Sequence, residues 1–476
     1  MIFTTFYTKN SPYEISVKKL QEDLLSYGYE IFIQCFPENS FWVETYGKLG
    51  NFIVDVMNRY NDDVIWIDAD AEVFKKPEEL FNIPLEADIA VYCNNDHFLL
   101  GTMLFRNRPH VKKFLKEWSK SVSTSSNTIS KMIFKRLIAS HPEIKIHPLP
   151  QRLCQIYDFP ITEEPVILHK QFSKLRKIDG KVKKLEERKR ILLPVILDGW
   201  AFNVRCNALQ KFLSHEYIFN IVSNEEIKHN VDDIDLVYFC TYEAILKRGH
   251  FFKNICASVA GLVINDLKNS MKYFGKAKAI AVLNQEWFRQ YNDLNIKQKL
   301  FYIPNSVDPK IFKKEKKEER EFTIGWVGNS LPYRENIKRS NILRETCKRL
   351  GIKFMEQNFK IKQISHEMMP KFYNNIDLYI NISTTEGSNN CILEAMSCEV
   401  PIAGTPVGNV PELIKDGIFV IKQDLSNLEE VILKIKAIKR EEREKIGKQL
   451  RFAIWNNYSW FYGAKRFKQM FDYCLE

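Results

Sequence analysis

The sequence has no apolar run approaching the roughly 20 residues that cross a bilayer as a helix. Its start, residues 1–6, also lacks the basic stretch and the long apolar core of a secretory signal. We therefore expect a protein that neither spans a membrane nor is secreted by a standard signal. Peripheral contact with a membrane surface is compatible with both absences.

Cysteine pairing is missing as well. The ten cysteines are scattered, with no CxxC pair and no regular spacing. This scatter excludes a zinc ribbon and a disulfide framework as organising features of the fold. Unpaired thiols are typical of a reducing compartment, so we predict a cytoplasmic protein.

What the sequence does have is length and an excess of positive charge. A chain of 476 residues is too long for one core and predicts roughly two to four domains. Its 45% hydrophobic and 27% charged residues are typical of a globular protein. The net charge of +11 fits an anionic partner such as nucleic acid, an acidic lipid surface or a phosphorylated donor, but a lysine-rich composition explains it equally well.

Short strands and helices alternate over residues 1–180. The expected elements are strands over residues 1–6 and 30–35 and helices over residues 16–27 and 47–60. They lead to residues 64–67, four apolar residues that run directly into Asp68 and Asp70. This pattern predicts a buried strand that ends in two carboxylates.

The spacing of these two aspartates allows metal chemistry. Side chains two positions apart at a strand end can turn toward one hard cation, with diphosphate oxygens filling its other positions. A divalent ion held in this way neutralises the leaving group as a glycosidic bond to diphosphate breaks. A pair of loop aspartates is the structural alternative, but the buried strand before Asp68 and Asp70 favours the metal site.

The segment resembles the DxD motif of GT-A fold glycosyltransferases, and residues 74–81 continue the likeness. The resemblance implies an α/β domain that transfers a sugar from a nucleotide-sugar donor with the help of Mn²⁺ or Mg²⁺. Asp68 and Asp70 would hold the ion, and Asp70 would also act as a catalytic residue.

The same resemblance suggests further site residues. Residues 99–107 look like the strand under the donor sugar, with Gly101 permitting close approach. His169 ends another apolar strand, and in similar transferases a late histidine is the third metal ligand, although a lone histidine is often structural. Phe6 and Lys48 are further candidate donor contacts.

A boundary is expected where the composition turns charged. Residues 179–190 have a glycine near their start and little to bury. We place the first domain at 1–180 and a charged linker at 181–190, for which a short solvated helix would serve equally well.

A second α/β alternation covers residues 191–312. It has a helix-like stretch at 205–213. Its strand candidates are residues 191–197, 218–222, 236–240, 258–264 and 279–283. The alternation predicts a second doubly wound sheet.

A third alternation covers residues 313–476, and its most informative stretch begins at Glu386. Glu394 follows after seven residues, and the apolar residues 400–403 predict the next strand. The polar run between the glutamates suits a backbone that passes close to a ligand; it consists of Gly387, Ser388, Asn389 and Asn390. In such a strand-loop-helix unit the helix N-terminus favours a phosphate.

This segment resembles the Glu-x7-Glu donor signature of retaining, family-4-like glycosyltransferases of the GT-B fold. The resemblance implies that Glu386 lies near the donor sugar as a catalytic residue, that Glu394 holds the ribose, and that the four residues after Glu386 line the donor. A helix start with a capping carboxylate is the structural alternative.

Other GT-B features are recognisable, some with departures. Gly328 ends a strand that would face the diphosphate, but Asn329 stands where the family usually has arginine. Arg334 or Lys338 could supply the charge, and the spacing does not choose between them.

Two features concern the relation between the domains of the GT-B half. The crossing at residues 305–308 has Ser306 in place of the family's glycine, and the helix that ends near Cys474 resembles one that packs back over the cleft. Residues 256–261 lack the histidine of many acceptor domains, and His250 precedes them.

The whole sequence therefore predicts a GT-A-like domain followed by two Rossmann-like domains of a GT-B fold. We predict a bifunctional enzyme that adds two sugars to one carbohydrate or lipid-linked acceptor, metal-dependent in the first half, and metal-independent and retaining in the second. A viral-type enzyme with a nucleic acid acceptor is one alternative. A protein with one half serving as a binding or scaffold module is another.

Overall fold

The chain forms two compact units, Met1–Arg188 and Lys189–Glu476. The computed structural model describes all residues except 38–46, 95–96, 124–129, 157–158, 171–176, 179–180, 183–184, 196–199, 224–225, 230–232, 242–244, 246–248, 260–273, 316–319, 330, 359–363 and 414–418. Within the described ranges, none of the helices combines the length and the apolar character that a membrane span requires.

The first unit is built on a six-stranded mixed sheet with the order β2-β1-β3-β6-β5-β7. The strands are β1 (Ile2–Thr8), β2 (Ile31–Phe36), β3 (Val64–Ile67), β5 (Ile89–Asn94), β6 (His97–Phe105) and β7 (Ile146–Pro148). β1 lies parallel to β2 and β3, whereas β6 is antiparallel to β3 and β5. A small second sheet contains β4 (Ala71–Val73), β9 (Ile167–His169) and β8 (Gln155–Ile156).

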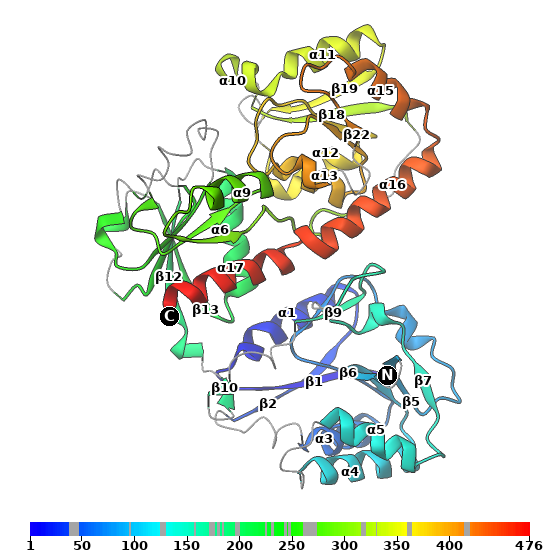
Figure 1. Ribbon diagram of the computed structural model, residues 1–476. Coiled ribbons are helices and arrows are strands. Elements are labelled where there is room, and N and C mark those ends of the chain that lie inside the picture. Colours follow the sequence, from blue (N-terminus) through cyan, green and yellow to red (C-terminus); the bar gives the residue numbers. More distant parts are fainter. Residues whose placement is uncertain are drawn as a thin grey trace. The chain divides into compact units, whose positions relative to one another are not determined.

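Helices cover both faces of the six-stranded sheet (Figure 1). They are α1 (Pro12–Ser26) on one face and α3 (Leu49–Tyr60), α4 (Pro109–Ser123) and α5 (Ser130–Ser140) on the other. Along β3, Val64 and Trp66 join the core that contains α3, α4 and α5, while Ile65 and Ile67 join the core that contains α1. The strand is therefore apolar at every position because both of its faces are buried.

Two helices begin earlier than the sequence patterns predicted. α1 starts at Pro12, about one turn before the expected start, because proline is well suited to the first helical position and Ser11 precedes it as the N-cap residue. α6 (Trp200–Leu213) likewise begins before the predicted start at residue 205.

The boundary between the units, after Arg188, lies within the expected linker at 181–190, but part of that linker is in strands. β10 (Lys177–Ile178) and β11 (Lys181–Val182) form an antiparallel pair, and β12 begins at Lys189. The last two residues of the expected linker are thus part of a strand. Asp235 supports this strand start, because its carboxylate accepts hydrogen bonds from Lys189 Nζ (2.7 Å) and from the Arg190 backbone N–H (2.8 Å).

The second unit contains two parallel sheets, which we call the first and second lobes. The first lobe has the strand order β13-β12-β14-β15-β16-β17. Its strands are β12 (Lys189–Val195), β13 (Tyr217–Ser223), β14 (Leu236–Phe239), β15 (Ile255–Ser258), β16 (Ala279–Val282) and β17 (Lys299–Tyr302). All of their pairings are parallel.

The position of β15 corrects the strand expected at 258–264. The strand ends at Ser258, where the expected strand begins, and residues 260–264 lie outside the described part of the chain. The pairing of Val237 with Ile255 and of Cys256 with Ala279 places the strand earlier. Its short apolar run is entirely buried between two neighbouring strands, so it lacks the alternation that marks a strand in the sequence.

The second lobe has the strand order β19-β18-β20-β21-β22, again with parallel pairings throughout. Its strands are β18 (Thr323–Gly328), β19 (Lys353–Asn358), β20 (Leu378–Asn381), β21 (Ile402–Gly404) and β22 (Phe419–Val420). Its helices are α10 (Pro332–Lys338), α11 (Ser340–Arg349), α12 (Met369–Asn374), α13 (Asn390–Ser397), α14 (Val410–Leu413), α15 (Leu428–Ala437) and α16 (Arg440–Ala453).

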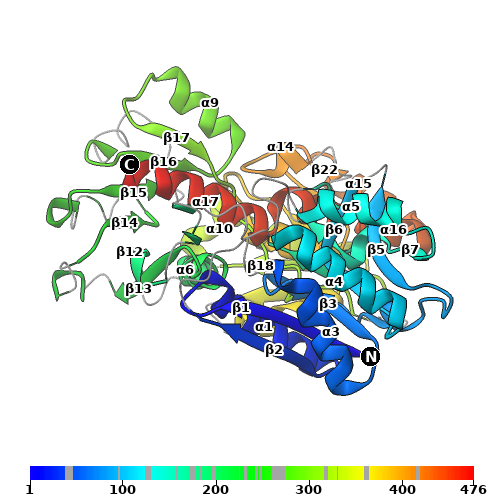
Figure 2. The same cartoon turned by 90° about the horizontal axis from the view of Figure 1, so that it is seen from below.

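The last helix returns from the second lobe to the first. α17 (Trp460–Leu475) packs on α6 and on β14 to β17, and both Figure 1 and Figure 2 show it along the sheet of the first lobe. The ring of Tyr238 meets those of Phe467 and Phe471 at centroid distances of 5.3 and 5.8 Å. Tyr217 Oη donates to Asp472 Oδ1 at 2.8 Å. The chain thus crosses between the lobes twice.

Candidate functional site

The turn between β3 and β4, residues 68–70, carries both aspartates of the first unit. The backbone N–H of Asp68 donates to the carbonyl of Gly101 at 2.8 Å, and the indole N–H of Trp66 donates to Asp68 Oδ1 at 3.0 Å. Antiparallel pairing of β4 with β9 places His169 opposite Ala71. Three strands from distant parts of the sequence therefore meet at this acidic turn.

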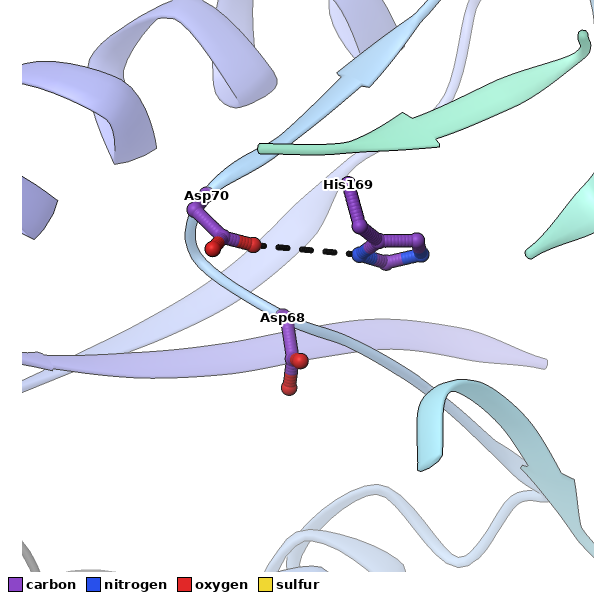
Figure 3. Close-up of side chains that lie close together, drawn as sticks. All are labelled: Asp68, Asp70 and His169. Atoms are coloured by element: carbon purple, nitrogen blue, oxygen red, sulfur yellow. Dashed lines mark ion pairs between the residues drawn. The ribbon is translucent and has the colours of Figure 1, made fainter. Parts of the chain in front are cut away.

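Asp68, Asp70 and His169 form a group that could hold a metal ion, as Figure 3 shows. Each offers one ligand atom within 4.8 Å of the others. His169 Nδ1 faces Asp70 Oδ1 at 3.8 Å, and both residues are more than nine-tenths buried. His169 Nδ1 has no hydrogen-bond partner within the described part of the chain.

The other ring nitrogen of His169 is held by a hydroxyl. His169 Nε2 and Thr102 Oγ1 are 2.9 Å apart, and Thr102 lies on β6 beside the end of β3. In the neutral ring with Nε2–H donating to Thr102, the lone pair of Nδ1 points toward the two aspartates, so a metal ion would take the place of the second ring proton. A histidine that ligates a metal usually has its second nitrogen engaged in this way.

The pKa values of His169 and Tyr13 indicate that the acidic turn at Asp68 and Asp70 favours positive charge. Burial lowers the pKa of His169, but Cys154, Asp70 and Asp68 raise it more strongly, to about 10. Burial also raises the pKa of Tyr13, and the charges of Asp70 and Asp68 raise it further. Tyr13 follows the first strand on α1 and was not singled out in the sequence, since no local pattern connects it with residues 68–70.

Gly101 has a different neighbour from the one expected. A Cβ atom at this position would lie 2.8 Å from Cε1 and 2.9 Å from Nδ1 of His169. The glycine therefore leaves room for the imidazole, and close approach of a donor sugar to Gly101 stays a prediction.

Replacing Gly101 by alanine is expected to move the His169 ring and to weaken Mn²⁺ binding by about tenfold or more, since disturbing the support of a ligand typically costs that much. Titration calorimetry with MnCl₂ would measure the change. Gly275→Ala is the control, because a Cβ there meets nothing within 4 Å. Equal Mn²⁺ affinity in Gly101→Ala and the wild type would show that the ring position does not matter to the metal.

Phe6 and Lys48 were predicted as donor contacts, and the structure gives their protein neighbours. The ring of Phe6 packs against Phe52 and Trp66 in the core, at centroid distances of 5.3 and 4.9 Å. Phe6 thereby supports Trp66, whose indole holds Asp68. Lys48 is exposed before α3, with Nζ 5.5 Å from the ring centroid of Phe36.

In the second unit, Glu386 lies in the loop before α13. Lys338 Nζ, from the end of α10, donates to Glu386 Oε1 at 2.5 Å, and Ser383 Oγ donates to the same oxygen at 2.8 Å. The sequence did not distinguish Lys338 from Arg334. The structure brings Lys338 to Glu386, while Arg334 lies about one turn earlier on the same helix.

Glu394, on α13, is almost completely buried. Tyr373 Oη donates to Glu394 Oε2 at 2.7 Å, and His366 Nε2 lies 3.4 Å from Oε1. Neither partner could be predicted from the sequence, because both lie outside the Glu-x7-Glu motif, in the helical segment 366–374. The chain itself therefore positions the carboxylate that was expected to hold a ribose.

Asn389 and Asn390 form the start of α13. The side chain of Asn389, the N-cap residue, accepts from the N–H of Ile392 at 3.2 Å, and its own N–H donates to Asn409 Oδ1 at 3.0 Å. Asn390 is the first helical residue. The N–H groups of a first helical turn have no acceptor within the helix, so they suit a bound anion.

The remaining predicted donor contacts are Gly328 and Asn329, at the end of β18, and Gly387, in the loop before α13. A Cβ at Gly328 would lie 2.7 Å from the ring of Trp326, so this glycine makes room for an indole. Asn329 Oδ1 accepts from the N–H of Leu331 at 3.1 Å. A Cβ at Gly387 would lie 3.2 Å from the Trp287 ring of the first lobe.

The crossing at residues 305–308 is held from both sides. The N–H of Val307 donates to the carbonyl of Tyr458 at 2.9 Å. Lys211 Nζ lies 2.5 Å from Asp308 Oδ2. A Cβ at Gly463 of α17 would lie only 2.3 Å from Ser306 Oγ. Ser306, which departs from the family pattern, is accommodated because residue 463 has no side chain.

Two family models match the chain. That of the nucleotide-diphospho-sugar transferases matches residues 54–185, and that of the group 1 glycosyl transferases matches residues 297–437. A comparison with curated protein sequences gives no match.

Solved structures resemble parts of the chain only distantly. Sucrose-phosphate synthase of Thermosynechococcus elongatus is 13% identical, with a TM-score of 0.48, over 60% of this chain and 98% of that one. HepE of Anabaena, solved with UDP-glucose, is 13% identical, with a TM-score of 0.45, over 60% and 99%. A glycosyltransferase of Rickettsia africae is 13% identical, with a TM-score of 0.46, over 61% and 99%.

The family matches agree with the two units. One match lies within the mixed α/β first unit, and the other lies within the second unit, whose two parallel sheets form a GT-B arrangement. The chain is therefore a glycosyltransferase that joins a nucleotide-diphospho-sugar transferase domain to a group 1 glycosyl transferase domain.

Proposed function

We propose that the protein transfers two sugars in succession from nucleotide-sugar donors to one carbohydrate or lipid-linked acceptor, with one transfer in each unit. The observation that carries this proposal is that one chain has both the Asp68–Asp70–His169 group and the Glu386 loop. The two sites have different chemistry, so we assign a different donor to each.

The first site fits Mn²⁺ or Mg²⁺. Two carboxylates and a ring nitrogen without a hydrogen-bond partner in the described chain form a suitable donor set. A bound ion would act as a Lewis acid on the departing diphosphate. Trp66 and the Gly101 carbonyl orient Asp68, and Thr102 orients the imidazole of His169, so the ligands are in place before the ion binds.

In the second unit we propose a transfer without metal and with retention of configuration. The ammonium group of Lys338 and the first-turn N–H groups of α13 would stabilise the departing diphosphate. Glu386 would lie beside the donor sugar and stabilise positive charge on its anomeric carbon. Because Lys338 also donates to Glu386, its ammonium group would be shared between this carboxylate and the diphosphate.

We propose that Glu394 binds the donor ribose. Tyr373 holds one carboxylate oxygen, and the longer contact with His366 at 3.4 Å involves the other. A ribose hydroxyl would replace or share the His366 contact, while the Tyr373 hydrogen bond keeps the carboxylate in place.

Thermal unfolding with a panel of sugar nucleotides, with and without MnCl₂, tests this assignment. We expect one donor that stabilises the protein only with metal and one that does so without it, each by ~5 °C or more at saturation. Asp68→Ala should abolish the first shift and Glu394→Gln the second. The proposal fails if no sugar nucleotide stabilises the protein, or if one variant abolishes both shifts.

A further inference from the structure

We propose that Arg205 of the first lobe is a positioning residue that acts through Asn305 on the loop 386–389, which we call the donor loop. The inference deepens the proposed function, because it assumes that this loop binds the donor of the second unit. It assigns a role in donor binding to two side chains of the opposite lobe.

Arg205 is a buried cation with neutral partners. Its side chain, on α6, is 7% exposed. Nη1 donates to Tyr238 Oη at 3.0 Å and to Ser258 Oγ at 3.3 Å, and Nη2 donates to Asn305 Oδ1 at 2.5 Å. These hydrogen-bond partners are two hydroxyls and an amide oxygen, and none of them is a carboxylate. Burying a guanidinium without a counter-ion is costly, so the hydrogen bonds it makes must be important.

The hydrogen bond to Asn305 fixes the direction of that amide. A guanidinium only donates, so Asn305 must present its oxygen to Arg205. Nδ2 then points the other way, where it donates to the carbonyl of Ser388 at 2.6 Å. With the amide reversed, two oxygens would face each other at Ser388. The Asn305 backbone N–H also donates to Ser388 Oγ at 3.1 Å.

A second asparagine of the first lobe is arranged in the same way. Asn284 Nδ2 donates to the carbonyl of Gly387 at 2.9 Å. Its Oδ1 accepts from the backbone N–H of Trp287 at 2.8 Å, which again fixes the direction of the amide. Two successive carbonyls of the donor loop, those of Gly387 and Ser388, therefore accept from asparagine side chains. The orientation of each amide is fixed by an N–H group that donates to its oxygen.

The carbonyls of Gly387 and Ser388 lie next to residues that we propose to bind the sugar nucleotide. Glu386 directly precedes Gly387, and Asn389, the cap of α13, directly follows Ser388. A substitution of Arg205 would therefore alter the orientation of the Asn305 side-chain amide. Through this amide it would affect the backbone between Glu386 and the N-terminus of α13. Arg205 itself hydrogen-bonds to Asn305 and not to the loop.

The substitution Asn305→Asp distinguishes a role in positioning the donor loop from a role in stabilising the fold. The carboxylate still accepts from Arg205 and gives this cation a counter-ion, so the melting temperature should stay the same or rise. Toward Ser388, however, an oxygen replaces the Nδ2 donor and repels the carbonyl. We expect amide hydrogen exchange at residues 387–389 to accelerate by about tenfold and the affinity for the second unit's nucleotide to fall by about tenfold.

A matched control is available before the start of β20, whereas the donor loop follows the end of that strand. Asn375 Oδ1 accepts from Arg320 Nη1 at 3.2 Å, and its Nδ2 donates to the carbonyl of Lys371 at 2.9 Å. Asn375→Asp makes the same chemical change in an arginine-asparagine-carbonyl chain away from the donor loop. It should leave loop exchange and nucleotide affinity unchanged. Arg205→Lys keeps the charge but loses the planar fork, and it should give an intermediate acceleration.

The two readouts distinguish the possible failures. Unchanged exchange at residues 387–389 in Asn305→Asp overturns the positioning role, whatever the protein binds. Faster exchange in a protein whose wild type binds no sugar nucleotide supports the positioning role but contradicts the proposed function. Faster exchange with unchanged nucleotide affinity overturns the assignment of this positioning to donor binding.

Discussion

Asp70→Asn is expected to lower kcat of the metal-dependent transfer by about 10³-fold. The substitution keeps the size of a side chain that is only 4% exposed, so the turn should fold as before. It removes one negative charge and one ligand from the group with Asp68 and His169. Initial rates across a MnCl₂ titration would measure the effect, and high Mn²⁺ should not restore the rate.

Asp55→Asn is the control for this experiment. Asp55 is exposed on α3 in the same unit, so the change in charge is identical but distant from the acidic turn. Its rate should stay within about twofold of the wild type. A metal-dependent rate in Asp70→Asn within about tenfold of the wild type would contradict the metal site.

Glu386→Gln is expected to lower kcat of the metal-independent transfer by about 10²- to 10³-fold, with a smaller change in KM for the donor. Glutamine retains an oxygen that can accept from Lys338 and Ser383, so the loop should keep its conformation. The negative charge beside the proposed position of the anomeric carbon is lost. Initial rates with saturating donor and no metal would measure this change.

Glu441→Gln, an exposed position on α16, is the matched control and should leave kcat unchanged. The metal-dependent transfer should also be unaffected by Glu386→Gln. If Glu386→Gln instead raised KM and left kcat intact, Glu386 would bind the donor without stabilising the transition state.

Some features were predictable because they are local in the sequence. The run from residue 64 to 67 is apolar at every position, which indicates a strand buried on both faces, and the two aspartates directly follow it. The loop and helix around Glu386 and Glu394 could likewise be predicted from polar residues followed by apolar helical spacing.

Local sequence patterns gave wrong strand boundaries where a short strand has no alternation of apolar and polar residues. The strand ending at Ser258 was expected to begin there, because four buried residues show no alternation. Charged residues at 189 and 190 suggested a linker, although the distant carboxylate of Asp235 accepts from the Lys189 ammonium and from the Arg190 backbone N–H at the strand start.

The contacts that define each site depend on distant pairs. Gly101 and His169 are 68 positions apart, and only the pairing of β4 with β9 shows that the glycine leaves room for the ring. The choice of Lys338 over Arg334 as the partner of Glu386 depends on the direction of α10. Neither relation has a sequence spacing that a pattern could reveal.

The sequence by itself determined the succession of α/β domains, the acidic pair after a buried strand and the two glutamates around a helix start. These features depend on neighbours along the chain, where apolar periodicity and turn residues act. His169 was a candidate third ligand in the sequence, and the tertiary structure decided between this role and a purely structural one by bringing it to the aspartates. Only the tertiary structure showed that Tyr373 holds Glu394 and that Arg205 orients Asn305. Such contacts arise when sheets and helices pack, and packing joins residues that the sequence separates.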